Sequence, residues 1–200
     1  MFVYHFQWDH RKIIRLINRL SLVDGRLSGF SEYFLLKVVE FQPDQQTEDK
    51  QSRRKADPED WTTSLEPRVR FDKWKYQEIL EKGVRPLSER EPYRATRILI
   101  DATATMIRLQ FHQDELEEGG SNDHSTLWCR RVNESSRHYQ DSREALVLAL
   151  SFACEKVYEK APESVAALDQ ALRNQRWDIF IRIRQHLYAL HHNNLSLIHI

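Results

Sequence analysis

Residues 92–111, Pro-Tyr-Arg-Ala-Thr-Arg-Ile-Leu-Ile-Asp-Ala-Thr-Ala-Thr-Met-Ile-Arg-Leu-Gln-Phe, decide the fold class of this chain. Apolar side chains recur there every three or four positions, at Ala95, Ile98, Leu99, Ala102, Met106 and Leu109. This spacing puts them on one face of an α-helix of about five turns. Pro92 suits the first turn, where the amide hydrogen that proline lacks has no helical partner. The stretch predicts a long helix with one buried face.

Similar spacing on both sides of this stretch predicts an all-α protein. The other helices are expected at Trp8–Leu22, Glu32–Phe41, Asp72–Gly83, Asp141–Glu159, Pro162–Arg173 and Trp177–Leu190, with a short helical turn at Leu127–Val132. Asp72 and Asp141 are expected N-caps, and Ser31 is a third candidate. Pro86 is expected to stop the helix that ends at Gly83. The segment Glu32–Phe41 is apolar nearly all round and also fits a buried strand; helix is preferred because its neighbours are helices.

The apolar stripes also predict which side chains face the core. Beyond the long helix, the expected inward side chains are Ile13, Leu16, Ile17, Leu20, Trp74, Ile79, Leu80, Val165, Leu168, Leu172, Trp177, Phe180, Ile183 (or Arg184), Leu187 and Leu190. The helix Asp141–Glu159 carries two adjacent apolar faces, one around Ala145, Ala149 and Phe152 and one around Leu146 and Leu150. Such a wide apolar surface indicates contact with more than one neighbour.

Successive helices that bury their apolar faces only against each other are typical of helical-repeat proteins. We therefore expect an irregular α-solenoid, without a fixed repeat period. The sequence divides into an N-terminal helical segment (1–42), a polar linker (43–68), a helical-repeat segment (69–194) and a tail (195–200). Residues 43–60 are polar almost throughout and are expected to form a disordered insertion, and residues 112–124 an acidic loop.

Composition narrows the functional classes. The chain has 30 Lys and Arg against 30 Asp and Glu, so its formal net charge is zero. A neutral chain lacks the broad positive field of nonspecific nucleic-acid binding, which makes a nucleic-acid partner an unfavoured hypothesis. Its two cysteines, Cys129 and Cys154, cannot build a zinc knuckle or a disulfide framework and suit a reducing compartment. No stretch reaches the roughly 20 apolar residues of a membrane span, and the N-terminus lacks a signal pattern, so a cytoplasmic location is expected.

Motifs for nucleotide, nucleophile and metal chemistry are missing from the sequence. We therefore expect no enzyme activity, no cofactor and no metal in this segment. The candidate binding residues are Arg173, Arg176, Arg182 and Arg184 around the last predicted hairpin. They could grip a phosphate or an acidic partner, although a solvated face with Arg stems over apolar surface explains them as well.

An enzymatic alternative rests on scattered polar residues. Asp114, Glu115 and Asp141 would have to converge in one pocket to serve a hydrolase or nuclease. His138 near Asp141 is a further candidate base. A small helical adaptor, complete as written, is another alternative.

Several segments resemble a known family. Leu87-Ser-Glu-Arg-Glu-Pro-Tyr-Arg-Ala-Thr-Arg-Ile-Leu-Ile-Asp101, Ser125-Thr-Leu-Trp128, Asp141-Ser-Arg-Glu-Ala-Leu146 and Ala171-Leu-Arg-Asn-Gln-Arg-Trp-Asp-Ile-Phe-Ile-Arg-Ile-Arg-Gln-His-Leu187 are similar to the C-terminal helical region of large bacterial STAND-type (signal-transducing) NTPases. The resemblance spans roughly residues 70–190 and consists of packing patterns. It implies a non-catalytic sensor or scaffold that recognises a protein partner or trigger, or contacts neighbouring domains of its own chain and so holds an oligomer together. The family's ATPase residues have no counterpart here.

The last six residues, Leu195-Ser-Leu-Ile-His-Ile200, resemble one translated frame of a sequencing adapter. This resemblance predicts that they are not native and that the chain is part of a larger protein. A frayed apolar C-terminus is the alternative.

Overall fold

The computed structural model describes residues 9–20, 29–56, 64–117, 123, 125–127 and 141–195, and the chain is mostly helical. The helices are α1 (His10–Leu20), α2 (Gly29–Val39), α3 (Thr47–Ala56), α4 (Lys73–Ile79), η2 (Leu80–Val84, a π-helical turn), α5 (Arg85–Arg90), α6 (Pro92–Arg108), α7 (Gln113–Glu117), η3 (Ser125–Leu127), α8 (Ser142–Lys160), η4 (Pro162–Ser164), α9 (Val165–Arg173) and α10 (Asp178–Leu195). Two short strands, β1 (Phe41–Gln42) and β2 (Arg68–Val69), pair antiparallel.

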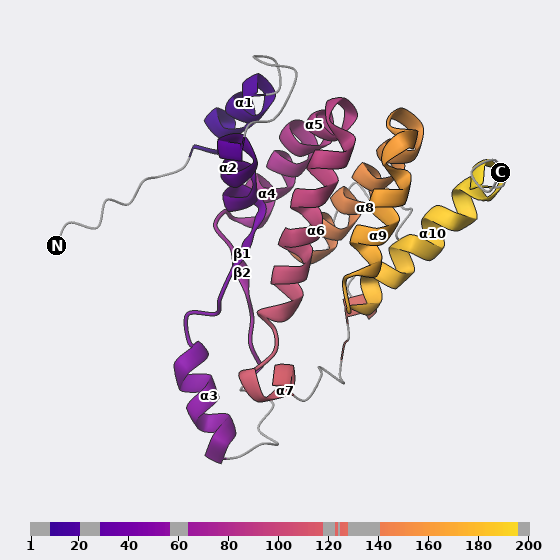
Figure 1. The fold of residues 1–200 in the computed structure, drawn as a ribbon. Coiled ribbons are helices and arrows are strands. Elements are labelled where there is room, and N and C mark those ends of the chain that lie inside the picture. Colours follow the sequence, from indigo (N-terminus) through magenta and orange to yellow (C-terminus); the bar gives the residue numbers. More distant parts are fainter. Residues whose placement is uncertain are drawn as a thin grey trace.

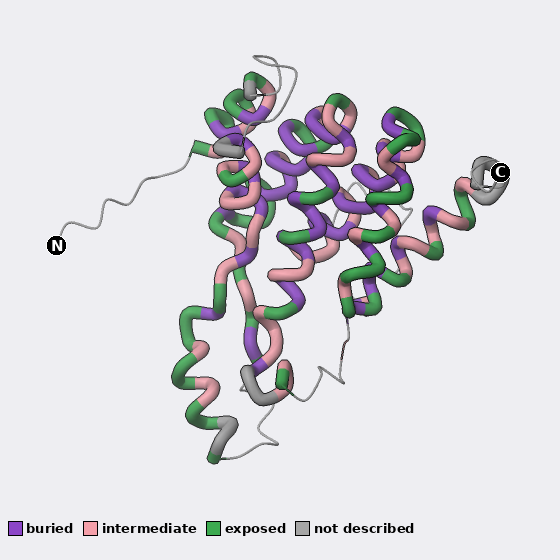
Figure 2. The backbone as a smooth tube through the Cα atoms, in the orientation of Figure 1, coloured by how far each residue is buried: buried purple, intermediate pink, exposed green. Residues whose placement is uncertain are grey.

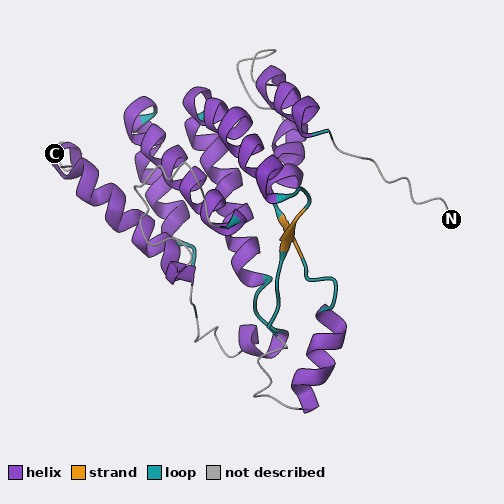
Figure 3. Ribbon diagram, turned by 180° about the vertical axis from the view of Figure 1, so that it is seen from behind, coloured by secondary structure: helices purple, strands orange, loops and turns teal. Residues whose placement is uncertain are grey.

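Most of these helices lie side by side in one row, from α1 and α2 at one end to α10 at the other (Figures 1 and 3). We call α1, α2, α4–α6 and α8–α10 the helical stack. The central pair, α6 and α8, makes the most extensive contact among the described elements. Residues 41–56 and 64–69, which carry β1, α3 and β2, project from one end of the stack, and we call these two described stretches the arm (Figure 1).

The long helix predicted at residues 92–111 is confirmed as α6, which begins at Pro92 and ends at Arg108. Its predicted inward residues are buried except Leu109, which is half-buried. Thr96, Ile100, Thr103 and Ile107 are buried as well. These extra positions lie beyond a single stripe because α6 packs against α2, α5, α8 and α9. The helix is therefore covered on more than one side, while Arg97, Asp101 and Arg108 stay exposed, and Figure 2 shows purple, pink and green along the central helices.

The prediction that Pro86 stops the helix ending at Gly83 is wrong. The chain passes from α4 through the π-helical turn η2 directly into α5, with Pro86 in the first turn of α5. A proline inside a helix leaves the carbonyl four residues earlier without its amide partner and clashes with it. Here that carbonyl belongs to Lys82, and Asn18 Nδ2 of α1 donates to it at 3.0 Å. The wider π-turn and the Asn18 side chain together accommodate the proline.

The expected polar loop at 43–60 is also corrected, because residues 47–56 form α3. None of the described side chains of α3 is buried, so no apolar face holds this helix. It begins instead at a buried carboxylate. Asp44 accepts hydrogen bonds from the backbone N–H of Gln46 (2.9 Å) and of Glu66 (3.0 Å), and from Lys50 Nζ (2.7 Å).

Asp44 thus joins the two described stretches of the arm, because it binds the backbone of Gln46 before α3 and of Glu66 before β2. Burial opposes ionisation of this carboxyl, but the hydrogen bonds from Lys50, Gln46 and Glu66 outweigh it and lower its pKa to about 2. Sequence reasoning missed this role because the three donors lie up to 22 residues away.

Three of the predicted inward residues are exposed. Leu16 is 42% exposed, Trp74 70% and Leu190 54%. Trp74 faces away because α4 buries Tyr76, Gln77 and Ile79. Leu16 is exposed because α1 buries its Ile13 and Ile17 face against the α4–η2–α5 segment, where Gly83 leaves just enough room for Ile17 (3.2 Å to a Cβ built at Gly83). Leu190 lies on an uncovered side of α10, whose next residue, His191, stacks on Tyr158 of α8 with the ring centroids 4.4 Å apart.

Other boundaries differ in detail. Phe41 was expected to end a helix, but α2 ends at Val39 and Phe41 belongs to β1. Ser31 lies inside α2 rather than at its cap. Part of the expected acidic loop forms α7. The caps Asp72 and Asp141 are confirmed, since their carboxylates accept from the backbone N–H of Lys75 and of Arg143.

The C-terminal hairpin is confirmed, with Val165, Leu168, Leu172, Trp177, Phe180, Ile183 and Leu187 buried. Its cap is a long-range contact. Asp123 Oδ2 accepts from the backbone N–H of Asp178 (2.6 Å), and Ser125 Oγ accepts from that of Ile179 (3.1 Å). A carboxylate at a helix N-terminus also meets the positive end of the helix dipole. At least one acid of the expected acidic loop therefore has a structural role.

Candidate functional site

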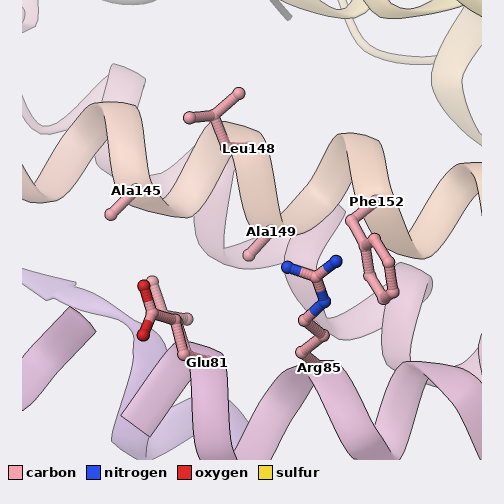
Figure 4. A pocket seen from close by; sticks show the side chains of 7 residues that line it. Glu81, Arg85, Ala145, Leu148, Ala149 and Phe152 are labelled. Atoms are coloured by element: carbon pink, nitrogen blue, oxygen red, sulfur yellow. The ribbon is translucent and has the colours of Figure 1, made fainter. Parts of the chain in front are cut away.

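A groove runs between the η2–α5 segment and α8 (Figure 4). It has a volume of about 40 Å³ and is lined by Leu80, Glu81, Arg85, Ala145, Leu148, Ala149 and Phe152. The η2–α5 segment and α8, which form the two walls of the groove, run parallel to each other in the same chain direction. Glu81 lies opposite Ala145, and Arg85 lies opposite Phe152.

The α8 wall is an apolar stripe. Ala145, Leu148, Ala149 and Phe152 follow the spacing i, i+3, i+4, i+7 of one helix face. Only Ala145 is fully buried, and the other three are half-buried. The stripe corresponds to one of the two faces predicted for this helix. The stack covers the Leu146 and Leu150 face completely and leaves this one partly open.

The opposite wall carries two charges of opposite sign. Glu81 and Arg85 both point from their helix toward α8, one on each side of a gap (Figure 4). Within the described residues, neither forms an ion pair. Glutamate followed by arginine four positions later usually pairs on a regular α-helix. The π-helical turn η2 lies between them, and its wider winding shifts the two side chains out of register.

The arginine is positioned by an aromatic ring. The guanidinium carbon of Arg85 lies 4.2 Å from the centroid of Phe152, and Lys156 Nζ lies 5.1 Å from the same ring. Cations are attracted to the negative face of an aromatic ring. Phe152 therefore holds the Arg85 charge at the groove while leaving its N–H groups available to a carboxylate.

The chemistry available in this groove is that of binding. Its lining contains one carboxylate, one guanidinium and apolar side chains. A guanidinium stays protonated in proteins, so these two groups cannot act as an acid–base pair. An apolar floor with a charged rim is the usual composition of a protein-binding surface.

A second groove, of about 440 Å³, lies between α2 and α6. Its lining carries two acids and two arginines, of which one acid and one arginine pair. Arg94 Nε lies 3.8 Å from Glu32 Oε1. A hydrogen bond with Tyr93 raises the pKa of Arg97, and partial burial raises the pKa of Asp101 despite the neighbouring Arg97. Among the described residues, Arg97 and Asp101 form no ion pair, so this groove also carries two charges of opposite sign.

The structure does not bring the four predicted arginines together at one point. Arg173 and Arg184 both bind Asp169, with Arg184 Nε donating at 2.8 Å and an Arg173 terminal nitrogen at 3.1 Å. The Arg176 guanidinium stacks over the Trp177 ring at 4.2 Å, and Arg182 donates to the carbonyl of Thr126 at 3.0 Å. The guanidinium of each of the four therefore has a contact within the chain.

Asp169 is the centre of a polar cluster between α9 and α10. Burial would raise its pKa, but hydrogen bonds from Arg184 and Tyr188 and the positive charge of Arg184 and Arg173 lower it. The same contacts raise the pKa of Arg184. The cluster fastens the two helices of the hairpin, and its donors and acceptors are used within the chain.

The residues of the enzymatic alternative occupy separate roles where the structure describes them. Glu115 accepts from the backbone N–H of His112 at 2.8 Å, and Asp141 caps α8 and binds Arg143. His138, Trp128 and Cys129 lie outside the described residues, as does the side chain of Asp114. Cys154 is buried in the core, and burial raises the pKa of its thiol.

Comparisons with protein-family models, with curated proteins and with solved structures found no match to this chain. In the described part of the chain, no helix has both the length and the apolar character that crossing a bilayer requires.

Proposed function

We propose that this chain is a non-catalytic helical scaffold that binds a protein partner through the groove between η2–α5 and α8. The observation that carries the proposal is the pair Glu81 and Arg85, which line an apolar groove without forming an ion pair within the described residues. Two charges held apart beside an apolar stripe fit a partner that supplies an apolar side chain and charges of opposite sign.

The row of helices supports a finer reading of the fold. The helices of the stack bury their apolar faces against one another, with α1 against the α4–η2–α5 segment, α2 against α6 and α6 against α8. This packing supports the proposal of an irregular α-solenoid. The resemblance of residues 87–101 and 171–187 to the helical region of STAND-type NTPases would make this stack a sensor or scaffold segment of such a protein, and a cytoplasmic one.

Site-specific photo-crosslinking tests the proposed groove. A photo-reactive amino acid at Leu148, on the groove rim, should crosslink to one defined protein in cells that produce the chain, and Arg85→Glu should reduce that adduct. The same amino acid at Glu163, which is exposed away from the groove lining, is the matched control. Equal adducts from both positions, or an adduct that Arg85→Glu leaves unchanged, would contradict the proposal.

A further inference from the structure

We infer that the partner in this groove is a second copy of the same chain, bound about a two-fold axis so that Glu81 of each copy pairs with Arg85 of the other. This inference rests on the proposed protein-binding function of the groove and names its partner.

The charge pattern of the groove is self-complementary. Glu81 and Arg85 point to the same side of their helix with a gap between them (Figure 4), and neither has an ion-pair partner among the described residues. A two-fold axis that passes between these two positions, perpendicular to the helix, places Glu81 opposite the partner's Arg85 and the reverse. One symmetric contact therefore neutralises four charges.

The apolar stripe suits the same symmetry. The same two-fold axis sets η2–α5 and α8 of one copy antiparallel to those of the other, so that the groove of each chain faces the groove of its partner. Ala145 and Ala149 are small, so they permit close approach, and Leu148 and Phe152 supply apolar area that one copy leaves half-exposed. Apolar seams flanked by reciprocal opposite charges are the usual arrangement of paired helices.

Neighbouring charges do not oppose this pairing. Glu89 is already bound to Lys160, and that hydrogen bond lowers the pKa of Glu89. Lys156 pairs with Glu159 at 2.5 Å. The positive charges of Lys156 and Arg85 also act on Glu89. Among the described residues, Glu81 and Arg85 are the groove charges that form no ion pair.

The experiment measures the oligomeric state of the purified chain by sedimentation velocity over a wide concentration range, with four variants. The wild type should associate to a dimer. Glu81→Arg and Arg85→Glu alone should each weaken association by about tenfold to a hundredfold, because each replaces two attractions by two repulsions across the axis. Both side chains are exposed, so circular dichroism should show unchanged helix content.

Two further measurements, in which association should be regained, test whether the pairing is reciprocal. The double variant Glu81→Arg/Arg85→Glu should regain wild-type association, because the two charges have only exchanged places. An equimolar mixture of the two single variants should form a heterodimer, since all four positions then meet an opposite charge. Glu163→Arg, a matched charge reversal outside the groove lining, should leave association unchanged.

A wild type that stays monomeric at every concentration overturns the inference, as does a mixture of the single variants that associates no better than either alone. The proposed function is judged separately by the adduct at Leu148. An adduct with a different protein would retain the protein-binding groove and reject the second copy as its occupant.

Discussion

The helices α8 and α3 form for different reasons. The stack buries eight residues of α8, including Leu146, Leu150 and Val157, each fully enclosed by neighbours. The arm buries no described side chain of α3. Burial of apolar surface stabilises α8, whereas the hydrogen bonds of Asp44 stabilise the start of α3. The difference predicts that the stack unfolds cooperatively and that the arm opens locally at a lower free-energy cost.

The largest expected effect is in the core of the stack. Leu146→Ala removes a fully buried side chain and should lower the free energy of unfolding by about 2–5 kcal/mol, because the cavity collapses only in part. Chemical denaturation followed by circular dichroism measures this change. Leu190→Ala is the matched control, since Leu190 is 54% exposed and should cost far less. Equal losses at the two positions would show that the stack does not pack as described.

A smaller effect is expected where the arm joins the stack. Tyr76 is fully buried, and its hydroxyl donates to the carbonyl of Val39, at the end of α2, at 2.8 Å. Tyr76→Phe keeps the ring but leaves that carbonyl without this donor. We expect a loss of about 1–2 kcal/mol in the free energy of unfolding, measured in the same denaturation experiment. No loss would indicate that another donor replaces the hydroxyl.

Within the arm, Asp44→Asn should act locally. It removes the charge that Lys50 binds and weakens the two backbone contacts, so the opening free energy of α3 should fall by about 1 kcal/mol. Hydrogen exchange of the α3 amides should become faster, while exchange in α8 stays unchanged. Asp49→Asn on the exposed side of α3 is the control. A parallel change in α8 would refute the separation of arm and stack.

Acid should reproduce the effect of Asp44→Asn in the wild type. The pKa of Asp44 is lowered from 3.8 to about 2, so its carboxylate stabilises the fold fully above pH 3.8, and this contribution is lost as the pH falls toward 2. The amide signal of Glu66 in NMR spectra should therefore report opening only in that acidic window. In the Asp44→Asn variant this pH dependence should be absent. A transition near neutral pH would contradict the assignment.

The smallest effect is expected two residues before Tyr76. Trp74 is 70% exposed, so Trp74→Ala should change the free energy of unfolding by less than about 0.5 kcal/mol. Comparison with Tyr76→Phe separates the two faces of α4. A loss above that of Tyr76→Phe would mean that Trp74 packs against something in solution.

The sequence predicted those elements whose signal is local. The spacing of α6, the caps Asp72 and Asp141 and the start of the C-terminal hairpin depend on residues within one or two turns, and all are confirmed. The α3 helix was missed because it lacks an apolar face, and because one of the contacts that fix Asp44 at its start comes from Glu66, 22 residues away. The sequence predicted only one of the two walls of the candidate groove. Its apolar wall on α8 follows a helical period, but its charged wall does not.

The sequence alone therefore determined that the chain is helical and which side chains could be buried, because periodic apolar side chains can leave water only on one side of a helix. Tertiary structure decided which faces were covered. Asn18 of α1 donates to the carbonyl of Lys82 that Pro86 leaves without its helical partner. The π-helical turn η2 lies between Glu81 and Arg85, and both charges line the groove. No local pattern contains that result, since it requires a contact between residues 64 positions apart.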